Sequence, residues 1–327
     1  MSRHNLFTSN SKKNTGTFCF FAKLGCVFLA LFLFFGKIIM PQYLYSYNAA
    51  LLDKMERLES IKEPKIVLIG NSNLTFGIKS ELLEKAFGMP VVNMGLHGSL
   101  GNSFHEEMAK VNVREGDIII IAHTEFADRD TISDPVIAWL TLENHPGLWK
   151  LLRTKDIPDM YFAFPDYAKR ALTLWLSKEG NEQNYGDVYS RLAFNEYGDI
   201  AFERQSSQLD VDTFFTSDRV AVPTINDTCV NRLNKLNQYV TERGATLLIA
   251  AYPIADVAVT PPAQDYIAFQ EKLQESLDCP VISDYTDYFI DGSYFYDHFY
   301  HLTDEGAVLR TNQLIQDLQQ WMASSQE

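Results

Sequence analysis

The sequence predicts an α/β protein, a three-layer α/β/α sandwich built on a five-stranded parallel sheet. Five short apolar runs alternate with segments of helical periodicity, which is the pattern of strands joined by crossover helices. The runs are largely continuous in apolar residues, as in strands that helices cover on both faces. Because parallel strands end at one edge of a sheet, reactive side chains are expected just beyond their carboxyl ends.

Capping residues and glycines separate the runs from the helices between them. The helix expected over 79–88 has Ser80 as its cap and Gly88 as its stop. The five expected strands are 65–70, 89–95, 115–123, 245–253 and 279–285. The remaining expected helices are 99–113, 226–244, 261–277 and 303–322.

The alternation is interrupted between about residues 127 and 225, which we interpret as a large, partly helical insertion. The stretch contains Trp139, Trp149 and Trp175. Loops on a rigid scaffold often carry specificity, so the insertion is a candidate for a substrate-facing cap. Its aromatic side chains have two interpretations, the core of a subdomain or faces that stack on sugars.

An apolar segment over 18–40 is about as long as a helix needs to be to cross a ~30 Å hydrocarbon layer. Its lysines, Lys23 and Lys37, lie near its ends, where their stems reach toward headgroups. Basic residues in the preceding tail, 1–17, predict a cytoplasmic N-terminus and an extracytoplasmic remainder. We therefore expect a single-pass protein of the cell membrane, in preference to a cleaved signal peptide or a buried helix.

Residues 41–63 are expected to form a juxtamembrane stalk with a short helix, and the globular domain is expected over 64–327. The chain has 327 residues, enough to bury a substantial core. Its formal charge of −14 and the lack of a basic stripe outside the N-terminus argue against a nucleic-acid partner.

The four cysteines fall into two pairs. Cys19 and Cys26 belong to the apolar segment, whereas Cys229 and Cys279 belong to the domain. In an oxidising space the second pair has two interpretations, a disulfide or two free buried thiols, and spacing alone does not choose between them.

Ser72 is the candidate nucleophile because it follows the first expected strand directly. A serine needs a neighbouring base to lose its proton, and the candidate base is His301, at the entry to the last helix. Such a base in turn needs an acceptor that fixes its tautomer, and Asp297 lies four residues earlier.

These residues stand in the order found in SGNH (GDSL-type) hydrolases, serine esterases and acyltransferases that the chain resembles. "GNSN" is similar to the first family block, with Ser72 as nucleophile and Asn71 in place of an aspartate. "NMGLHGSLG" is similar to the second block, and the resemblance implies that the N–H groups of Ser72 and Gly98 help form an oxyanion hole. "DHFYHLTDEG" is similar to the last block, which supplies the base.

Two departures from the family pattern bear on the chemistry. The last block here reads Asp-x-x-x-His, so Asp297 and His298 are both candidates for the third triad member, with Asp297 favoured as a carboxylate. In the third block Glu125 stands where the family has an asparagine that donates to the oxyanion, and an ionised glutamate only accepts hydrogen bonds. Either Asn73 or a backbone N–H compensates, or Glu125 holds a sugar hydroxyl, holds His301, or stays protonated.

The resemblance extends to a membrane-anchored bacterial subgroup that includes the teichoic-acid D-alanylation protein and the alginate O-acetylation factors. It implies an acyltransferase or esterase acting on O-acyl groups of a cell-surface polysaccharide, without a cofactor. It also implies a membrane-bound O-acyltransferase as partner. Glu125, His97 and His298 are candidate substrate-binding residues, although His97 and His123 also fit structural roles. A metal site at Asp297, His298 and His301 is a minor alternative, and we expect none.

The contrasting hypothesis is a catalytically inactive scaffold or glycan-binding subunit of a cell-envelope assembly complex. It is motivated by the altered third block and by the altered spacing before His301. The separation of the Ser72 hydroxyl from the His301 ring discriminates between the two hypotheses.

Overall fold

The structure, a computed structural model, describes residues 11–127, 131–143, 145–181, 186–217, 221–259 and 263–325. Its centre is a parallel sheet with the strand order β2-β1-β3-β4. The strands are β1 (Ile66–Gly70), β2 (Val91–Asn93), β3 (Ile118–Ala122) and β4 (Thr246–Ile249). The register aligns Ile66 with Val91 and with Ile118, so these three strands start in line, and β1 and β3 also end in line, at Gly70 and Ala122. The predicted α/β class and parallel sheet are confirmed.

The fifth expected strand, 279–285, does not form as a strand of this sheet. Only Val281 pairs, as an isolated parallel bridge with Ile249, and the Ile282 N–H donates to the Ile249 carbonyl at 2.9 Å. Pro280 has no N–H for a ladder, and Asp284 already caps the 3₁₀ turn η8 (Tyr285–Tyr288). The five-stranded prediction is therefore replaced by four strands and one bridge.

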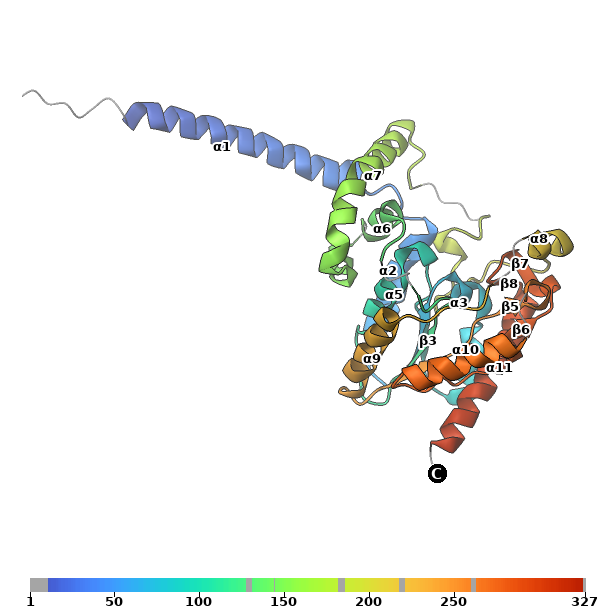
Figure 1. Cartoon of the computed structure of the whole chain (residues 1–327). Helices are drawn as coiled ribbons and strands as arrows, with labels where there is room; N and C mark the ends of the chain where they lie inside the picture. The colour runs from blue at the N-terminus through green and yellow to red at the C-terminus, as the bar shows by residue number, and fades with distance from the viewer. Residues whose placement is uncertain are drawn as a thin grey trace, which may run out of the picture.

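Helices cover both faces of this sheet (Figure 1). Alternate strand residues such as Ile66 and Leu68 pack with Leu83 and Leu314 in one apolar cluster, while Val67 and its equivalents pack in a larger cluster on the opposite face. The first face is covered by α4 (Ser80–Phe87) and α11 (Asp304–Ser324). The second face is covered by α2 (Leu51–Ser60), α5 (Asn102–Ala109), α9 (Asp227–Thr241) and α10 (Ala263–Ser276).

Short elements complete the described fold at the carboxyl edge and around it. The helices and turns among them are α3 (Ser72–Gly77), α8 (Val211–Ser217), η2 (Tyr47–Ala50), η3 (Gly98–Leu100), η6 (Arg191–Ala193), η7 (Asp256–Ala258) and η9 (Gly292–Tyr294). The strands among them are the parallel pair β5 (Ile254–Ala255) and β6 (Phe289–Ile290) and the antiparallel pair β7 (Phe295–His298) and β8 (His301–Leu302).

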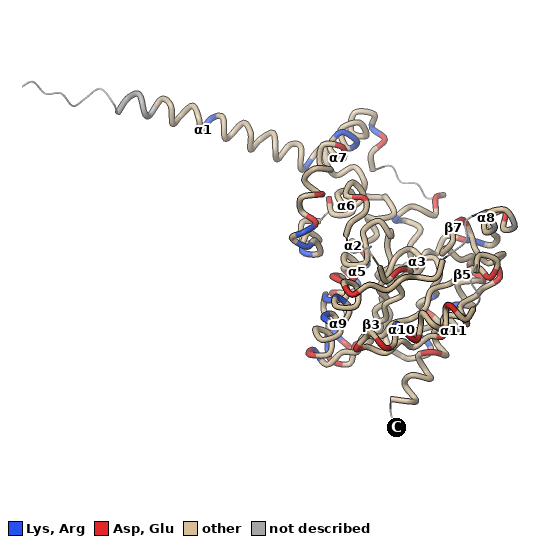
Figure 2. Tube along the Cα trace, viewed as in Figure 1, with Lys and Arg blue, Asp and Glu red and all other residues tan. Residues whose placement is uncertain are grey.

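The apolar N-terminal segment forms α1 (Ser11–Phe34), which a π-helical turn, η1 (Phe35–Ile39), continues. The 24 residues of Gly16–Ile39 make a helix long and apolar enough to cross a membrane, and α1 extends away from the domain (Figure 1). Between residues 16 and 36 Lys23 is the one charged residue (Figure 2).

The expected stalk at 41–63 is instead part of the domain. Leu51, Met55 and Leu58 recur at helical spacing and bury one face of α2 in the larger apolar cluster. Lys54 is buried as well, and its ammonium donates to the carbonyls of Asn93 and Gly198 at 2.8 and 2.5 Å. The domain thus begins directly after the apolar helix.

The insertion leaves and rejoins the core at one place, because Phe126 pairs with Ile225 in a parallel bridge. Its first half contains α6 (Pro135–Leu142), η4 (Pro146–Leu151), η5 (Thr154–Asp156) and α7 (Ile157–Ser177). Its second half crosses to the β2 edge, where Asp199 accepts hydrogen bonds from Ser80 and Asn93. Residues 128–130 lie outside the described residues.

Cys229 and Cys279 are both buried thiols that form no disulfide, so the disulfide interpretation is not supported. Burial raises the pKa of the Cys279 thiol to about 12, which keeps it protonated at neutral pH.

A buried ion pair fixes the start of β1 against β3. The Lys65 ammonium lies 2.7 Å from the Asp117 carboxylate, and both side chains are essentially inaccessible to solvent. The same carboxylate accepts the backbone N–H groups of Lys65 and Arg114. Removing it leaves a cation and two backbone donors buried without this acceptor.

Asp117→Ala is expected to lower the free energy of unfolding by about 3–5 kcal/mol, as when one partner of a buried pair is removed. Chemical unfolding of the detergent-solubilised chain, followed by tryptophan fluorescence, measures the loss. The control is Glu59→Ala, because Glu59 pairs with Lys150 at 2.8 Å and both are about half exposed. A change within about 0.5 kcal/mol is expected for the control, and equal losses in the two variants would contradict the assignment.

Candidate functional site

Ser72 lies at the turn between β1 and α3. Asn71 caps α3, since its side-chain oxygen accepts the Asn73 N–H at 3.0 Å. Gly70 ends the strand where a Cβ would come within 2.9 Å of the Ala122 carbonyl oxygen, so only glycine allows β1 and β3 to approach this closely there. These contacts hold the first residue of α3, Ser72, at the carboxyl edge of the sheet.

His301 lies on the β7–β8 hairpin just before α11. The hairpin pairs His298 with His301 and Phe295 with Leu302, so β7 holds two more residues than β8 between these pairs. Asp297 lies in this irregular part of β7, which allows its carboxylate to turn toward His301. The irregularity explains how an Asp-x-x-x-His spacing still brings an aspartate to the histidine.

The three side chains form a continuous hydrogen-bonded relay. The Ser72 hydroxyl oxygen lies 2.9 Å from Nε2 of His301, and Nδ1 of His301 lies 2.8 Å from Oδ1 of Asp297. Asp297, rather than His298, therefore contacts the base. With the proton on Nδ1 donated to Asp297, Nε2 is free to accept the Ser72 proton, as a general base requires.

The environment keeps the histidine neutral and the aspartate ionised. Burial lowers the pKa of His301, and the positive charge of Arg204 lowers it further, against the opposing effect of Asp297. Burial alone would raise the pKa of Asp297, but hydrogen bonds from His301 and Tyr189 outweigh it and hold that pKa below its ordinary value. A neutral imidazole beside a carboxylate is the resting state that a base catalyst needs.

Three residues that sequence reasoning missed hold the imidazole in place. The Phe76 ring stacks on it with centroids 3.9 Å apart and planes 8° from parallel, and Arg204 lies over the Phe76 ring at 5.4 Å. The Tyr189 hydroxyl donates to Oδ2 of Asp297 at 2.6 Å and lies 3.3 Å from Nδ1 of His301. Tyr189 and Arg204 belong to the insertion, and no motif in the sequence singles them out.

Asn73 does not serve as an oxyanion donor. Its side chain is fully buried and donates to Oδ1 of Asn71 and to the Ala122 carbonyl, while its oxygen accepts from Arg310 at 2.7 Å. The prediction for Asn73 is therefore wrong, because both amide hydrogens are used to shape the turn that carries Ser72.

Gly98 lies beside this turn. A Cβ on Gly98 would lie 3.6 Å from Cβ of Asn71, in ordinary contact, and Gly98 is not in the left-handed region, which Gly101 adopts instead. Within the described residues, the N–H groups of Ser72 and Gly98 donate to no protein acceptor. Both are therefore available to an anionic oxygen.

Glu125 lies beyond β3 at the rim of a cavity of about 380 Å³, together with Thr124, Phe299 and Tyr300. Its backbone carbonyl accepts from Asn102 at 2.8 Å. Glu125 does not orient His301, because Asp297 and Ser72 already contact the two ring nitrogens. The other interpretations of Glu125, including contact with a sugar hydroxyl, remain predictions.

The other histidines have different environments. The His298 ring lies 4.9 Å from the His301 ring and is exposed at the site, whereas Nδ1 of His97 accepts the Ser99 N–H at 3.1 Å and so caps η3. His123 is buried, with Nε2 3.1 Å from Glu106, which also pairs with Arg232. These buried contacts indicate that His123 has a structural role, as the sequence suggested.

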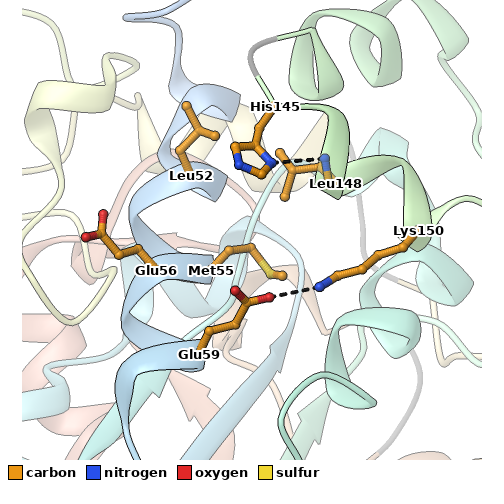
Figure 3. A pocket seen from close by; sticks show the side chains of 8 residues that line it. Leu52, Met55, Glu56, Glu59, His145, Leu148 and Lys150 are labelled. Atoms are coloured by element: carbon orange, nitrogen blue, oxygen red, sulfur yellow. Dashed lines mark hydrogen bonds and ion pairs between the residues drawn. The ribbon is translucent and has the colours of Figure 1, made fainter.

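A second cavity opens on the Asp297 side of the relay. It has a volume of about 570 Å³ and is lined by Tyr189, Gln208, Tyr296 and Asp297 among others. Figure 3 shows a different cavity, of about 380 Å³, between α2 and η4. The Glu59–Lys150 ion pair crosses that cavity, and His145 accepts the Gly147 N–H there. No relay residue lines it, so we do not assign the chemistry to it.

Among the described residues, no group of three or more His, Cys, Asp or Glu side chains gathers to hold a metal ion. Comparison with protein-family models and with curated proteins returned no match for this chain. The relay of Ser72, His301 and Asp297 is therefore the feature of the chain that points most directly to a function.

Proposed function

We propose that the chain is a membrane-anchored, extracytoplasmic serine acyltransferase or esterase of the SGNH type. Its substrates are O-acyl groups of a cell-surface polysaccharide. The observation that supports this best is the 2.9 Å contact between the Ser72 hydroxyl and Nε2 of His301, completed by Asp297. Residues 229 positions apart in the sequence meet in the order, and at the distances, that nucleophilic catalysis requires.

The proposed reaction has two steps. Ser72 Oγ attacks the acyl carbonyl carbon while His301 accepts the hydroxyl proton, and the tetrahedral intermediate then expels the alcohol, which takes that proton from His301. In the second step a water or sugar hydroxyl gives its proton to His301 and attacks the acyl-serine, releasing the acid or a new ester. Asp297 stabilises the imidazolium in both steps.

The oxyanion is held by the N–H groups of Ser72 and Gly98, since neither is engaged in the free protein. In the SGNH family an asparagine side chain of the third block is a third donor, and Glu125 stands in its place here. One such donor contributes about 3 kcal/mol to lowering the barrier, so we expect a slower enzyme than one with three donors.

The acceptor decides between hydrolysis and transfer. A domain that begins directly after a membrane-spanning helix works close to the bilayer surface, where acyl groups delivered by a membrane-bound O-acyltransferase become available. This placement favours transfer to a glycan hydroxyl. The inactive-scaffold alternative is less favoured, because a buried, aligned relay costs desolvation that a binding subunit does not require.

A fluorophosphonate probe is expected to label the full-length chain at Ser72, because the polarised hydroxyl attacks phosphorus as it attacks an acyl carbon. Ser72→Ala is expected to abolish labelling, and His301→Gln to slow it by about 10³-fold or more. Ser99→Ala, in the loop that carries Gly98, is the control and should label like the parent. Gel fluorescence and peptide mapping give the readout. Modification of a different residue, or none, would exclude the nucleophile.

Acyl exchange tests the substrate class. Purified chain in detergent is expected to release acetate from an O-acetylated oligosaccharide, or to transfer acetyl from an activated ester to an oligosaccharide. Both activities should be lost in Ser72→Ala. Mass spectrometry of the oligosaccharide and assay of free acetate separate the two outcomes. Reactivity toward the probe without exchange on any glycan would retain the serine chemistry and reject the glycan substrate.

The rate of Ser72 labelling is expected to rise with pH and to have its midpoint below 6.5. Only neutral His301 accepts the proton, and its folded-state pKa is lowered, so activity is present above that pKa and lost as pH falls through it. Asp297→Asn should reduce the rate by about 10⁴-fold by favouring the wrong tautomer. A midpoint above 6.5 in the parent chain would be inconsistent with the buried base.

A further inference from the structure

α7, the long helix of the insertion, has two apolar faces. One is buried, where Met160, Tyr167 and Ala171 pack toward α6 and the segment after α1. The other is exposed to solvent and carries large side chains that are between 37% and 77% accessible. These side chains, called the α7 stripe below, are Ile157, Tyr161, Phe162, Leu172, Trp175 and Leu176.

The stripe occupies one side of the helix. At about 100° per residue, its six members fall within roughly 140° of the helix circumference, adjoining the buried face. The exposed Lys169 is the one charged residue of α7 within that arc. Asp159, Asp166, Arg170 and Thr173 occupy the narrow remaining sector, and all four are exposed. α7 is apolar over most of its circumference, but the protein buries only part of that surface. The rest is an exposed apolar patch of the kind that marks an interaction site.

The stripe lies where α1 meets the domain. The Trp175 ring contacts the Phe34 ring edge to face, with centroids 6.2 Å apart, and Phe164 lies 6.1 Å from Phe35. Phe34 and Phe35 belong to the last turns of the apolar helix, and Figure 1 shows α7 running across the end of α1. The exposed apolar surface of α1 therefore continues onto α7.

α7 is fastened to the chain that leaves α1. The Tyr167 hydroxyl donates to the Met40 carbonyl at 3.0 Å. Beyond the end of the helix, Asn181 accepts from the Leu44 N–H at 2.8 Å and donates to the Gln42 and Pro41 carbonyls. The position of α7 relative to the end of α1 is thus fixed by the fold.

Charge around α7 differs from the rest of the chain. Residues 145–181 contain six Lys and Arg against four Asp and Glu, although the whole chain has a formal charge of −14. Lys150, Arg153 and Lys155 precede the helix, and Lys169, Arg170 and Lys178 lie toward its end (Figure 2). Basic residues that flank an apolar stripe suit lipid phosphates.

We propose that α7 is an interfacial helix that lies in the headgroup region of the bilayer that α1 spans, with its stripe buried among the lipid chains. The inference rests on the membrane anchor of the proposed function. It adds a second lipid contact, which holds the domain against the outer surface in one orientation. Trp175, at the level of the last turn of α1, occupies the depth that tryptophan favours.

The test uses the full-length chain reconstituted in phosphatidylcholine–phosphatidylglycerol vesicles. In a Cys19→Ser and Cys26→Ser background, nitroxides are attached to Phe162→Cys and Leu176→Cys in the stripe. Thr173→Cys and Asp166→Cys are the matched controls on the polar side of α7, and Leu29→Cys in α1 reports the anchor. Accessibility of each nitroxide to oxygen, which partitions into lipid, is compared with accessibility to a water-soluble nickel complex.

Both stripe labels and the α1 label are expected to favour oxygen, and both polar-side labels the nickel complex. A lipid-exposed α1 label with water-exposed stripe labels would overturn the inference and leave the anchor intact. A water-exposed α1 label would remove the anchor and the inference together, whereas Ser72 labelling tests the chemistry separately. Stripe labels shielded from both reagents would reveal a protein cover and overturn it too.

A second measurement does not depend on introduced cysteines. Brominated lipid chains should quench the tryptophan fluorescence of the parent chain more than that of Trp175→Phe, since Trp175 is the tryptophan of the stripe. Trp321 lies in α11, far from α1 in Figure 1, so the quenched fraction of Trp321→Phe should be at least as large as that of the parent chain. Equal quenching in the parent and in Trp175→Phe would place Trp175 outside the lipid.

Discussion

The candidate site depends on one buried ring, the imidazole of His301. Phe76 covers its face, Asp297 holds Nδ1, and Ser72 contacts Nε2, so the ring has a single orientation and a single useful tautomer. Ser72 and Phe76 belong to α3, whereas Asp297 belongs to the β7–β8 hairpin that also carries the ring. Without the ring, the Ser72 hydroxyl is a turn serine, and Asp297 is a half-buried carboxylate without its main partner.

Polar side chains around the serine are used mainly to shape the turn. Asn71 caps α3, and Asn73 bridges it to β3, while the buried Arg310 guanidinium binds the Asn73 carbonyl and side chain. Asn73, which the sequence suggests as an oxyanion donor, therefore has a structural role instead. The free backbone N–H groups of Ser72 and Gly98 remain, which explains how the site can accommodate an anionic oxygen without a third side-chain donor.

The sequence allowed the α/β class, the parallel core strands and the apolar helix to be predicted, because continuous apolar runs and their glycine stops are local signals. It also predicted that Ser72, Asp297 and His301 lie together, as they do in the structure. It failed where the outcome depends on tertiary packing. Residues 41–63 resemble a stalk until Leu51 and Met55 meet the sheet, and 279–285 resembles a strand until Pro280 and the η8 turn limit it to one bridge. Tyr189 and Arg204 carry no local signal, since their partners lie about a hundred residues away.

The insertion links the two ends of this structure. The segment after α1 fastens α7 through residues 40–44, and its next two residues contact the insertion a second time. The Tyr45 carbonyl accepts the Arg191 N–H, and Ser46 forms a β-bridge with Ser190, the residue that follows Tyr189. The chain that leaves α1 therefore holds α7 on one side and the tyrosine that contacts Asp297 on the other. If the stripe of α7 lies in lipid, the same few residues that set the tilt of the domain also position the relay. The distance of Ser72 from the bilayer is then a property of the fold, which suits the proposed function, in which the acyl donor would arrive through the membrane.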